Sequence, residues 1–317
     1  MGTNNKKVCI GIDVSKATLD IYCQSNSYKI PNESESVSEF IESKLVLKQD
    51  LFCVMESTGG YERVAAKVFR NAGIPVHIAH PNKVSSFAKA TNHFTKTDKL
   101  DAILLHQYAE FISGREQGSI VVNDSQDDLL ALRRLASAIE SNLHAAQCRL
   151  KQLPKPCVGY LEKEIKLHKK QLIAIQKDID TRIEGDKELK SKRDLMVSMK
   201  GMGKKSASIL LAELPELGTA SPKKIARLAG LAPKTYQSGI KTTNGHISGG
   251  RFYVRRILYI IALVASRHDL TMKKRYKQLQ ERGKPKKVAL VAIMRDLLII
   301  LNAMIRDTCE YKQVINS

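Results

Sequence analysis

Residues 8–31 have the sequence VCIGIDVSKATLDIYCQSNSYKIP, in which three short runs of apolar and β-branched residues are separated by turn residues. Such runs predict three strands, at 8–13, 18–24 and 28–31, joined by tight turns. Consecutive strands with short connections pair antiparallel. We therefore expect the chain to begin with a three-stranded meander.

The next segment of the chain alternates between helical and strand patterns. Strands are predicted at 51–56 and 75–79, and helices near 37–47, 62–71, 82–90 and 99–113. A meander followed by alternating helices and strands indicates a mixed sheet flanked by helices, an α/β domain over residues 1–125. This order is similar to that of ribonuclease-H-like domains, but each half of an actin-like ATPase begins in the same order, so the order alone leaves both folds open.

The pattern changes at about residue 126. From there to about residue 190, leucine and isoleucine recur at three- and four-residue spacings with charges between them, which predicts two long amphipathic helices. Pro154 and Pro156 separate the two helices, because proline lacks the N–H group that a helix interior needs. We expect an antiparallel hairpin that ends near Gly185, a coiled-coil spacer that also supplies a dimer contact.

Residues 191–317 are predicted to form a mainly α-helical domain. Helices are expected at 222–230, 253–265, 273–282 and 286–306, with a basic, glycine-rich loop at 233–250. Before them, a Gly-x-Gly turn at 201–203 enters a helix and resembles the turn of helix-hairpin-helix modules, whose backbone N–H groups grip a phosphate. A plain helical hairpin explains the same turn. No Walker-type Gly-Lys-Ser/Thr loop follows, so the turn is weak evidence for a nucleotide site.

The positive charge of the chain is concentrated toward its C-terminal end. The formal net charge is +20, with a pI near 9.7. Residues 1–125 contain 14 basic and 14 acidic residues, residues 126–190 contain 13 and 10, and residues 191–317 contain 25 and 8. A surplus of this size favours a phosphate-rich partner over a merely solubilising surface. We expect residues 191–317 to form the main nucleic-acid surface.

The chain shows no sequence signal for export or for a membrane. No hydrophobic stretch follows the first residues, so no signal peptide is predicted. The longest apolar run, 288–305, is interrupted by Arg295 and Asp296 and falls short of a membrane span. Six cysteines are scattered without a Cys-x-x-Cys pair, which favours reduced thiols. We expect a cytoplasmic bacterial protein, associated with the nucleoid when active, that has no membrane partner.

Four carboxylates occupy positions from which they can form a metal site. Asp13 and Glu56 each end an apolar strand, and Asp98 and Asp101 are three residues apart on one helix face. Four negative charges brought together need compensating cations, and hard oxygen ligands suit Mg²⁺ or Mn²⁺. Two such metals stabilise the attacking and leaving oxygens of a phosphodiester. The alternative is that all four are ordinary helix-start, turn and strand-end residues.

Ser238 is a candidate nucleophile in the basic loop. Cations close to it would favour its alkoxide and bind the phosphate that it attacks. Ser238 precedes Gly239, however, and Ser-Gly is also an ordinary turn dipeptide; Ser248 in Ile-Ser-Gly-Gly is a rival. The cations that we expect to contact nucleic acid are Lys204, Lys205, Lys241, Arg251, Arg255 and Arg256.

Four motifs of the chain together resemble those of one family. They are Gly-Ile-Asp-Val-Ser-Lys around Asp13, Glu-Ser-Thr-Gly-Gly-Tyr from Glu56, Lys-Thr-Asp-Lys-Leu-Asp-Ala around Asp98 and Asp101, and Gly-Leu-Ala-Pro-Lys-Thr-Tyr-Gln-Ser-Gly around Ser238, followed by Arg255-Arg256. These motifs are similar to those of the DEDD transposases of bacterial insertion sequences and of the related Piv-type DNA invertases. The likeness covers almost the whole chain in the right order.

The resemblance implies a fold, a site and partners. It implies a ribonuclease-H-like domain similar to the RuvC resolvase, a coiled-coil spacer and a C-terminal transposase domain. The metal-binding tetrad becomes Asp13, Glu56, Asp98 and Asp101, with Ser238 as the nucleophile. Asp20 matches the family without belonging to the tetrad, and Ser248 has no counterpart in it. Family members of the insertion-sequence type are guided by a structured non-coding RNA that pairs with donor and target DNA.

The sequence thus predicts a site-specific DNA recombinase or transposase that uses Mg²⁺ and a phosphoserine intermediate. A homodimer or homotetramer is expected, in which the tetrad of one protomer can act with the serine of another. A Piv-type invertase, and a Holliday-junction nuclease in which Ser238 is only a turn residue, are the enzymatic alternatives. The non-enzymatic alternative is an architectural protein that binds DNA or RNA. An actin-like ATPase fits the first strands but not the basic C-terminal region.

Overall fold

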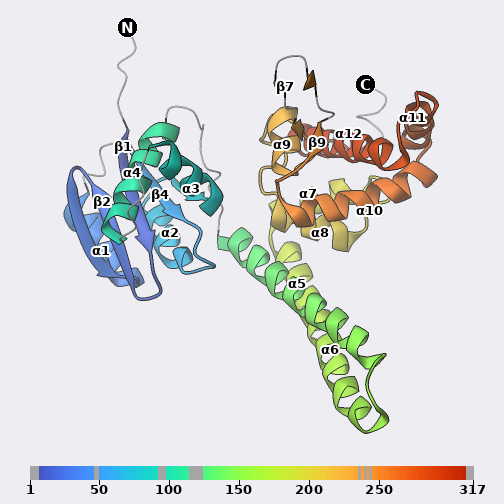
Figure 1. The fold of residues 1–317 in the computed structure, drawn as a ribbon, viewed down its shortest axis with the longest axis horizontal. Helices are drawn as coiled ribbons and strands as arrows, with labels where there is room; N and C mark the ends of the chain where they lie inside the picture. Colours follow the sequence, from blue (N-terminus) through green and yellow to red (C-terminus); the bar gives the residue numbers. More distant parts are fainter. Residues whose placement is uncertain are drawn as a thin grey trace. The chain divides into compact units, whose positions relative to one another are not determined.

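The chain forms two units, Met1–Val121 and Val122–Ser317, which we describe separately. The structure is a computed structural model, and it describes residues 7–45, 50–91, 98–113, 124–234, 237–238, 241–242 and 245–311. The first unit contains a five-stranded sheet with helices around it, whereas the second is built mainly from helices (Figure 1). An α/β domain followed by a helical region agrees with the sequence prediction.

The sheet of the first unit has the strand order β3-β2-β1-β4-β5. Strand β2 is antiparallel to both β1 and β3, while β4 runs parallel to β1 and β5 runs parallel to β4. The predicted meander and mixed sheet are therefore confirmed. The strands are β1 (Val8–Val14), β2 (Thr18–Cys23), β3 (Asn26–Pro31), β4 (Leu51–Glu56) and β5 (Val76–Ala79).

Helices cover both faces of this sheet (Figure 1). Ile10 and Ile12 of β1 belong to the core formed with α1 and α2. Cys9 of β1 and Val54 of β4 belong to a second core, formed with α3 and α4. Side chains alternate along a strand, so Asp13 stands on the same face as Cys9, under α4. The helices are α1 (Ser34–Lys44), α2 (Glu62–Asn71), α3 (Pro81–Ala90) and α4 (Asp98–Ser113).

The second unit begins with a long helical hairpin of α5 (Asp124–Leu150) and α6 (Lys155–Gly185). The two helices are antiparallel, because Arg182 near the end of α6 lies 2.6 Å from the carboxylate of Asp128 near the start of α5. A separate apolar cluster packs the far end of the hairpin. Pro154 is the N-cap of α6, where a missing N–H group costs the helix nothing. The break between the helices falls where the sequence predicted it.

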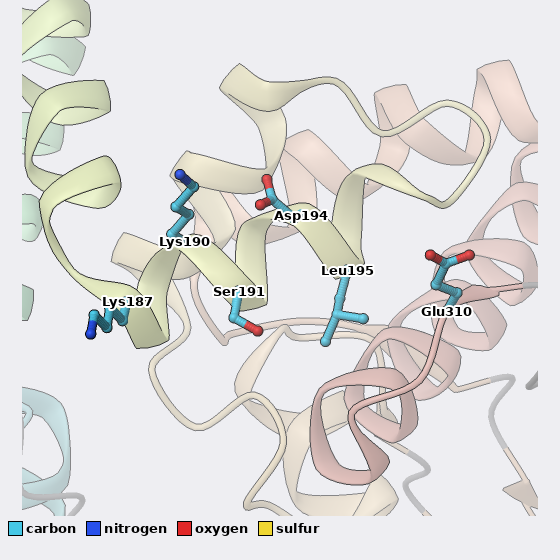
Figure 2. A pocket seen from close by; sticks show the side chains of 6 residues that line it. All are labelled: Lys187, Lys190, Ser191, Asp194, Leu195 and Glu310. Atoms are coloured by element: carbon cyan, nitrogen blue, oxygen red, sulfur yellow. The ribbon is translucent and has the colours of Figure 1, made fainter.

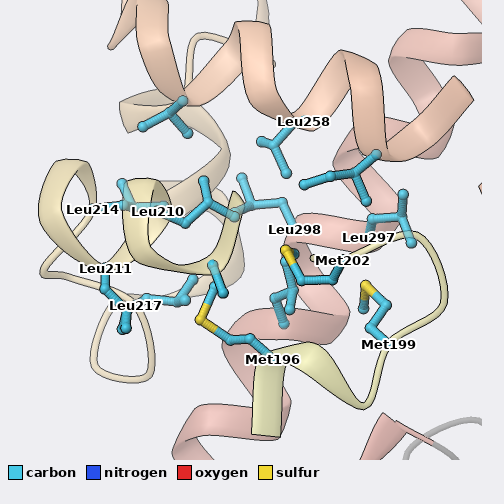
Figure 3. Close-up of a cluster of buried hydrophobic side chains, with 14 of the residues drawn as sticks. Met196, Met199, Met202, Leu210, Leu211, Leu214, Leu217, Leu258, Leu297 and Leu298 are labelled. Carbon is cyan, nitrogen blue, oxygen red and sulfur yellow. The ribbon is translucent and has the colours of Figure 1, made fainter. Parts of the chain in front are cut away.

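A core rich in methionine and leucine holds the rest of the second unit together. Figure 3 shows Met199 and Met202, from the turn between α7 and α8, beside Leu297 and Leu298 of α12. Ile183 of α6 belongs to the same core, which anchors the hairpin. The helices that follow the hairpin are α7 (Lys187–Val197), α8 (Lys204–Glu213), α9 (Pro222–Leu228), α10 (Phe252–His268), α11 (Leu270–Glu281) and α12 (Lys286–Asp307).

Among the described helices, α12 is the one that is long and apolar enough to cross a membrane by length and composition. Its side chains Ile293, Leu297 and Leu301 are fully buried in the core of the second unit. Its Asp296 lies 3.3 Å from the guanidinium of Arg275 on α11. The apolar side of α12 is therefore occupied by the other helices of its own unit.

The basic loop predicted at 233–250 instead contains four two-residue strands. Strand β6 (Pro233–Lys234) pairs with β9 (His246–Ile247), and β7 (Gln237–Ser238) pairs with β8 (Lys241–Thr242), so one hairpin is nested inside another. The sequence predicted a basic, glycine-rich loop without these pairings, because strands of two residues are too short to show an alternating pattern.

Candidate active site

A row of carboxylates crosses the sheet of the first unit near the end of β1. Asp13 lies directly opposite Asp20 of β2 in the antiparallel pair. On the other side of β1, Ile12 is in register with Met55 of the parallel strand β4. The residues that follow them, Asp13 and Glu56, are therefore neighbours as well. All three carboxylates belong to the sheet face that α4 covers.

The charges of this row favour a cation beside it. Like charges placed opposite each other on paired strands repel. At the outer end of the row, Lys29 of β3 is in register with Asp20, and its Nζ lies 3.1 Å from the carboxylate. Asp20 thus takes part in a cross-strand ion pair. Asp13 and Glu56 form the centre of the row.

Helix α4 crosses the sheet in close contact because β1 has glycine at position 11. A Cβ atom on Gly11 would lie 2.2 Å from the backbone nitrogen of His106 and 2.3 Å from the carbonyl oxygen of Ala102. The Nδ1 atom of His106 lies 3.0 Å from the carbonyl oxygen of Cys9. We therefore infer the direction of α4 along β1. As the helix is followed from His106 back to Ala102, it runs in the same direction as β1 from Cys9 toward Asp13. The N-terminal turn of α4 is directed to the end of the sheet that carries the row.

This direction brings the other two predicted ligands to the same end of the sheet. Asp98 occupies the helix position one turn before Ala102, although its side chain lies outside the described part of the chain. Asp101 shares a helix face with Leu105 and Tyr108, which pack in one cluster with residues of β4. The positions of the predicted tetrad thus come to one sheet end from β1, β4 and α4.

Among the side chains that the structure describes, no three His, Cys, Asp or Glu residues are grouped closely enough to hold a metal ion. Asp13, Glu56 and Asp101 therefore do not form a complete site by themselves. The donor chemistry nevertheless fits Mg²⁺ or Mn²⁺, because every candidate supplies carboxylate oxygens. Convergence of all four carboxylates on a metal stays a prediction.

Two polar residues beside the row were not foreseen from the sequence. Asn32 follows β3 directly, and Glu62 is the first residue of α2. Glu62 is only 6% exposed. Burial alone would raise the pKa of Glu62, but hydrogen bonds from backbone N–H groups, including those of Gly60 and Thr58, outweigh it and lower the pKa below its usual value. Neither residue belongs to a recognisable motif, so no sequence signal pointed to them.

Ser238 lies on β7 of the nested hairpin, with its backbone directly opposite Lys241 of β8. The side chains of both residues lie outside the described part. The rival Ser248 is exposed just after β9. The base of the hairpin is tight: Gly230 and Gly250 both have positive φ, and a Cβ atom on Gly250 would lie 2.2 Å from the backbone nitrogen of Gly230. The close approach at this base requires glycine.

The arginines predicted to contact nucleic acid also serve the base of this hairpin. The Arg251 guanidinium donates to both carboxylate oxygens of Glu216, with Nη2 at 2.5 Å from Oε1, and to the carbonyl oxygen of Glu213 at 2.9 Å. Arg255 donates to the carbonyl oxygen of Gly249. Arg251 is therefore an internal support of the hairpin, and phosphate contact by either arginine stays a prediction.

Three other cations of the second unit are exposed. Arg256 on α10 is exposed, as are Lys204 and Lys205 in the first turn of α8. The Nζ atom of Lys205 lies 3.4 Å from Glu140 of α5, which partly neutralises it. The turn before α8 buries its methionines but leaves Gly201 and Gly203 exposed. A phosphate can reach that turn, although phosphate binding there stays a prediction.

Two hollows open on the second unit. One, of about 420 Å³, is bordered by α7 and Glu310 (Figure 2). Lys190, which lines it, is engaged in an ion pair with Glu184 at 3.0 Å. The other, of about 670 Å³, lies between α6 and Lys205 of α8. Neither hollow is lined by a predicted catalytic residue, so the carboxylate row and the serine hairpin are the better candidates.

Two family models match the chain. Residues 10–154, which include the predicted tetrad, match a model described as "Transposase", of the IS110 DEDD type. Residues 193–277, which include Ser238, match the model "Transposase IS116/IS110/IS902 family". Together the two models cover most of the chain.

Individual relatives agree with the family models. The chain is 28% identical to the pilin gene-inverting proteins of Moraxella lacunata and Moraxella bovis, over 98% of its own length and 99% of theirs. It is 31% identical to an uncharacterized 43.6 kDa protein of the insertion element IS110 from Streptomyces coelicolor, over 37% of this chain and 30% of that protein.

These matches identify a class of protein, an enzyme that recombines DNA. Within that class, the chain belongs to the family of the IS110-type DEDD transposases and the gene-inverting proteins related to them.

Proposed function

We propose that this protein is a site-specific recombinase that cleaves and exchanges DNA strands with Mg²⁺ or Mn²⁺ and a serine nucleophile. The observation that carries the proposal is the register of β1 and β4, in which Asp13 and Glu56 are neighbours at the sheet end toward which α4 directs its first turn. The strand order β3-β2-β1-β4-β5 supports the expectation of a RuvC-like, ribonuclease-H-like domain.

In this proposal the carboxylates and the serine have separate roles. Asp13, Glu56, Asp98 and Asp101 hold the metals, which stabilise negative charge on the phosphate and on the leaving oxygen. The Ser238 hydroxyl gives up its proton and its Oγ attacks phosphorus. A new P–O bond forms, the bond to one deoxyribose oxygen breaks, and that oxygen takes a proton. The phosphoserine linkage conserves the energy of the cleaved phosphodiester bond, so the DNA can be joined to a new strand.

The basic C-terminal region binds the backbones of donor and target DNA in this proposal. Its 25 basic residues against 8 acidic ones supply the required charge. The α5–α6 hairpin acts as a coiled-coil spacer between domains at 1–125 and 191–317 and provides the contact of a homodimer or homotetramer. A structured guide RNA is included on the family resemblance alone.

DNA inversion is a second candidate for the outcome of strand exchange. The likeness to the pilin gene-inverting proteins extends over nearly the full length of both chains, whereas the IS110 relative matches over 37% of this chain. Both outcomes use the same cleavage and joining chemistry. They differ in which ends are joined.

The experiment that tests the proposal uses DNA from the native locus. A plasmid carrying the gene with its natural flanks is introduced into a heterologous bacterial host, and the new DNA junctions are amplified and sequenced. Excised circles or insertions at a defined target support transposition, and inverted segments support inversion. If DNA is bound but no junction forms, in cells or with purified protein and Mg²⁺, the architectural alternative is favoured instead.

A further inference from the structure

We propose that Asn32 and Glu62 are positioning residues that set the spacing between the carboxylates of Asp13 and Glu56. The inference rests on the proposed metal-dependent function. It adds two residues outside the predicted tetrad. Their place in the fold suggests it: Asn32 contacts both loops that follow the carboxylate-bearing strands, and Glu62 contacts the second of these loops.

Asn32 joins the loop after β1 to the loop after β4. Its Nδ2 atom donates to the carbonyl oxygen of Ser15 at 2.9 Å and to the carbonyl oxygen of Tyr61 at 3.0 Å. Ser15 follows Asp13 by two residues, and Tyr61 ends the loop that begins after Glu56. Two carbonyl acceptors fix the orientation of the amide, because only its nitrogen can donate. One side chain therefore ties the two loops at a set separation.

Glu62 fixes the shape of the second loop. Its Oε2 atom accepts hydrogen bonds from the Thr58 N–H at 3.2 Å, the Thr58 hydroxyl at 3.2 Å and the Gly60 N–H at 2.8 Å. Gly59 and Gly60 have φ of 78° and 124°, a region that glycine enters without strain but that gives the backbone little rigidity of its own. The buried carboxylate of Glu62 therefore supplies the order that the glycines do not.

The two residues form one continuous support. Asn32 contacts the carbonyl of Tyr61, and Glu62 is the next residue in the chain. Mg²⁺ and Mn²⁺ demand closely defined distances and directions from their oxygen ligands. Any change in the separation of the two loops is passed to the adjoining strand ends, where Asp13 and Glu56 stand. Loss of this support should therefore weaken metal binding more than it weakens the fold.

Matched control residues exist in the same unit. Asn26 donates through Nδ2 to the Gln24 carbonyl at 3.0 Å, a similar bond in the turn between β2 and β3. Glu42 is an exposed glutamate on α1. Asn26→Ala and Glu42→Ala therefore remove the same chemical groups away from the carboxylate row.

The test measures Mn²⁺ binding to the full-length protein by electron paramagnetic resonance of the free ion, together with thermal unfolding. Asn32→Ala and Glu62→Ala are expected to raise the half-saturating Mn²⁺ concentration about tenfold. Glu62→Gln removes the charge but keeps an acceptor oxygen, so it should stay within about threefold of the wild type. The two control variants should bind Mn²⁺ like the wild type.

The Asp13→Asn variant distinguishes a failure of the proposed metal tetrad from a failure of the proposed positioning role. If the wild type binds no Mn²⁺, or if Asp13→Asn binds it unchanged, the proposed metal tetrad fails. If Asp13→Asn loses binding but Asn32→Ala and Glu62→Ala behave like their controls, the positioning role alone is overturned. Should Asn32→Ala not fold, Asn32→Gln keeps the donor but displaces it by one methylene, and the same tenfold loss is expected from it.

Discussion

In the first unit, acidic residues are placed by strand register and by a helix that lies directly on Gly11. In the second unit, cations such as Lys204 and Arg256 are exposed on helices. Basic residues far outnumber acidic ones there, and this excess is a clearer feature of the second unit than any fixed arrangement of the cations. The difference fits the two proposed tasks, metal ligation in the first unit and DNA binding in the second. Metal ligation tolerates little displacement, whereas neutralising a phosphate backbone depends on how many charges reach it. Substitutions in the two units should therefore fail in different ways.

The largest effect is expected in the carboxylate row. Asp13→Asn, Glu56→Gln or Asp101→Asn should lower strand exchange more than about 1,000-fold, because removing a ligand removes charge stabilisation worth several kcal/mol at the phosphate. DNA affinity should stay within about twofold. Junction formation and filter binding on the same protein preparations measure the two quantities.

Asp20→Asn is the matched control for that series. Asp20 lies opposite Asp13 but is paired with Lys29, so its loss should change strand exchange by less than about fivefold. If Asp20→Asn were as inactive as Asp13→Asn, Asp20 would also be required for strand exchange. The predicted set of four catalytic carboxylates would then be incomplete.

The next effect concerns the nucleophile of the second unit. Ser238→Ala should abolish a covalent protein–DNA adduct trapped under denaturing conditions and should abolish recombination, while DNA binding persists. Ser248→Ala should retain both, since Ser248 lies outside the paired strands of the hairpin. An adduct that survives Ser238→Ala and disappears with Ser248→Ala would move the nucleophile, and recombination without any adduct would favour direct attack by a metal-activated hydroxyl.

The sequence predicted the fold of the first unit well because its strands carry clear signals. The runs at 8–13, 18–24 and 51–56 are bounded by turn residues, and the prolines at 154 and 156 mark the hairpin connection. The strands β6 to β9 were missed because two-residue pairings depend on the hairpin base, where Gly230 meets Gly250. That contact joins residues twenty positions apart and leaves no periodic pattern.

The candidate site was predictable only in part. Asp13 and Glu56 end apolar strands, a visible feature, and the register makes them neighbours. The contacts on which the proposed positioning role of Asn32 and Glu62 rests could not be predicted, because no spacing reveals them. Arg251 was predicted from the sequence only as a contact to nucleic acid, and its pairing with Glu216 inside the unit could not be predicted because no spacing reveals it.

A smaller effect is expected at the base of the serine hairpin. Gly250→Ala places a Cβ atom against the backbone of Gly230 at positive φ, so the free energy of unfolding should fall by about 1–3 kcal/mol. If the base positions Ser238, strand exchange should fall on the order of 100-fold while DNA affinity changes less than about threefold. Thermal unfolding, junction formation and DNA binding measure these three quantities.

Gly283→Ala separates backbone strain from crowding. Gly283 also has positive φ, but a Cβ atom there meets nothing within 4 Å. Its substitution should cost stability of about 1 kcal/mol and leave strand exchange close to wild type. Equal losses of strand exchange in the two variants would mean that general destabilisation, and not the hairpin base, limits the reaction.

The smallest effect is expected for substitutions that reduce the number of positive charges available for DNA binding on the second unit. The turn between α11 and α12 is strongly basic, and Glu281 is the one acidic residue of segment 273–287. Its exposed cations are Lys273, Lys274, Lys277, Arg282, Lys284, Lys286 and Lys287. Replacing the last three by glutamine should weaken DNA binding about tenfold near 0.1 M salt and reduce the slope of log affinity against log salt by about 2–3, since each lost phosphate contact removes about one released counterion.

The α5–α6 hairpin offers the control for this last variant. Lys163, Lys166 and Lys170 are exposed on α6, in a segment whose charge is nearly balanced. Replacing these three by glutamine removes the same net charge from the chain, so any effect of total charge alone appears equally in both triple variants. A larger loss for the α11–α12 variant assigns DNA contact to that turn, because an unlocalised field would weaken equally wherever the three charges are removed. Equal losses would mean that the basic C-terminal region attracts DNA without a defined contact surface there.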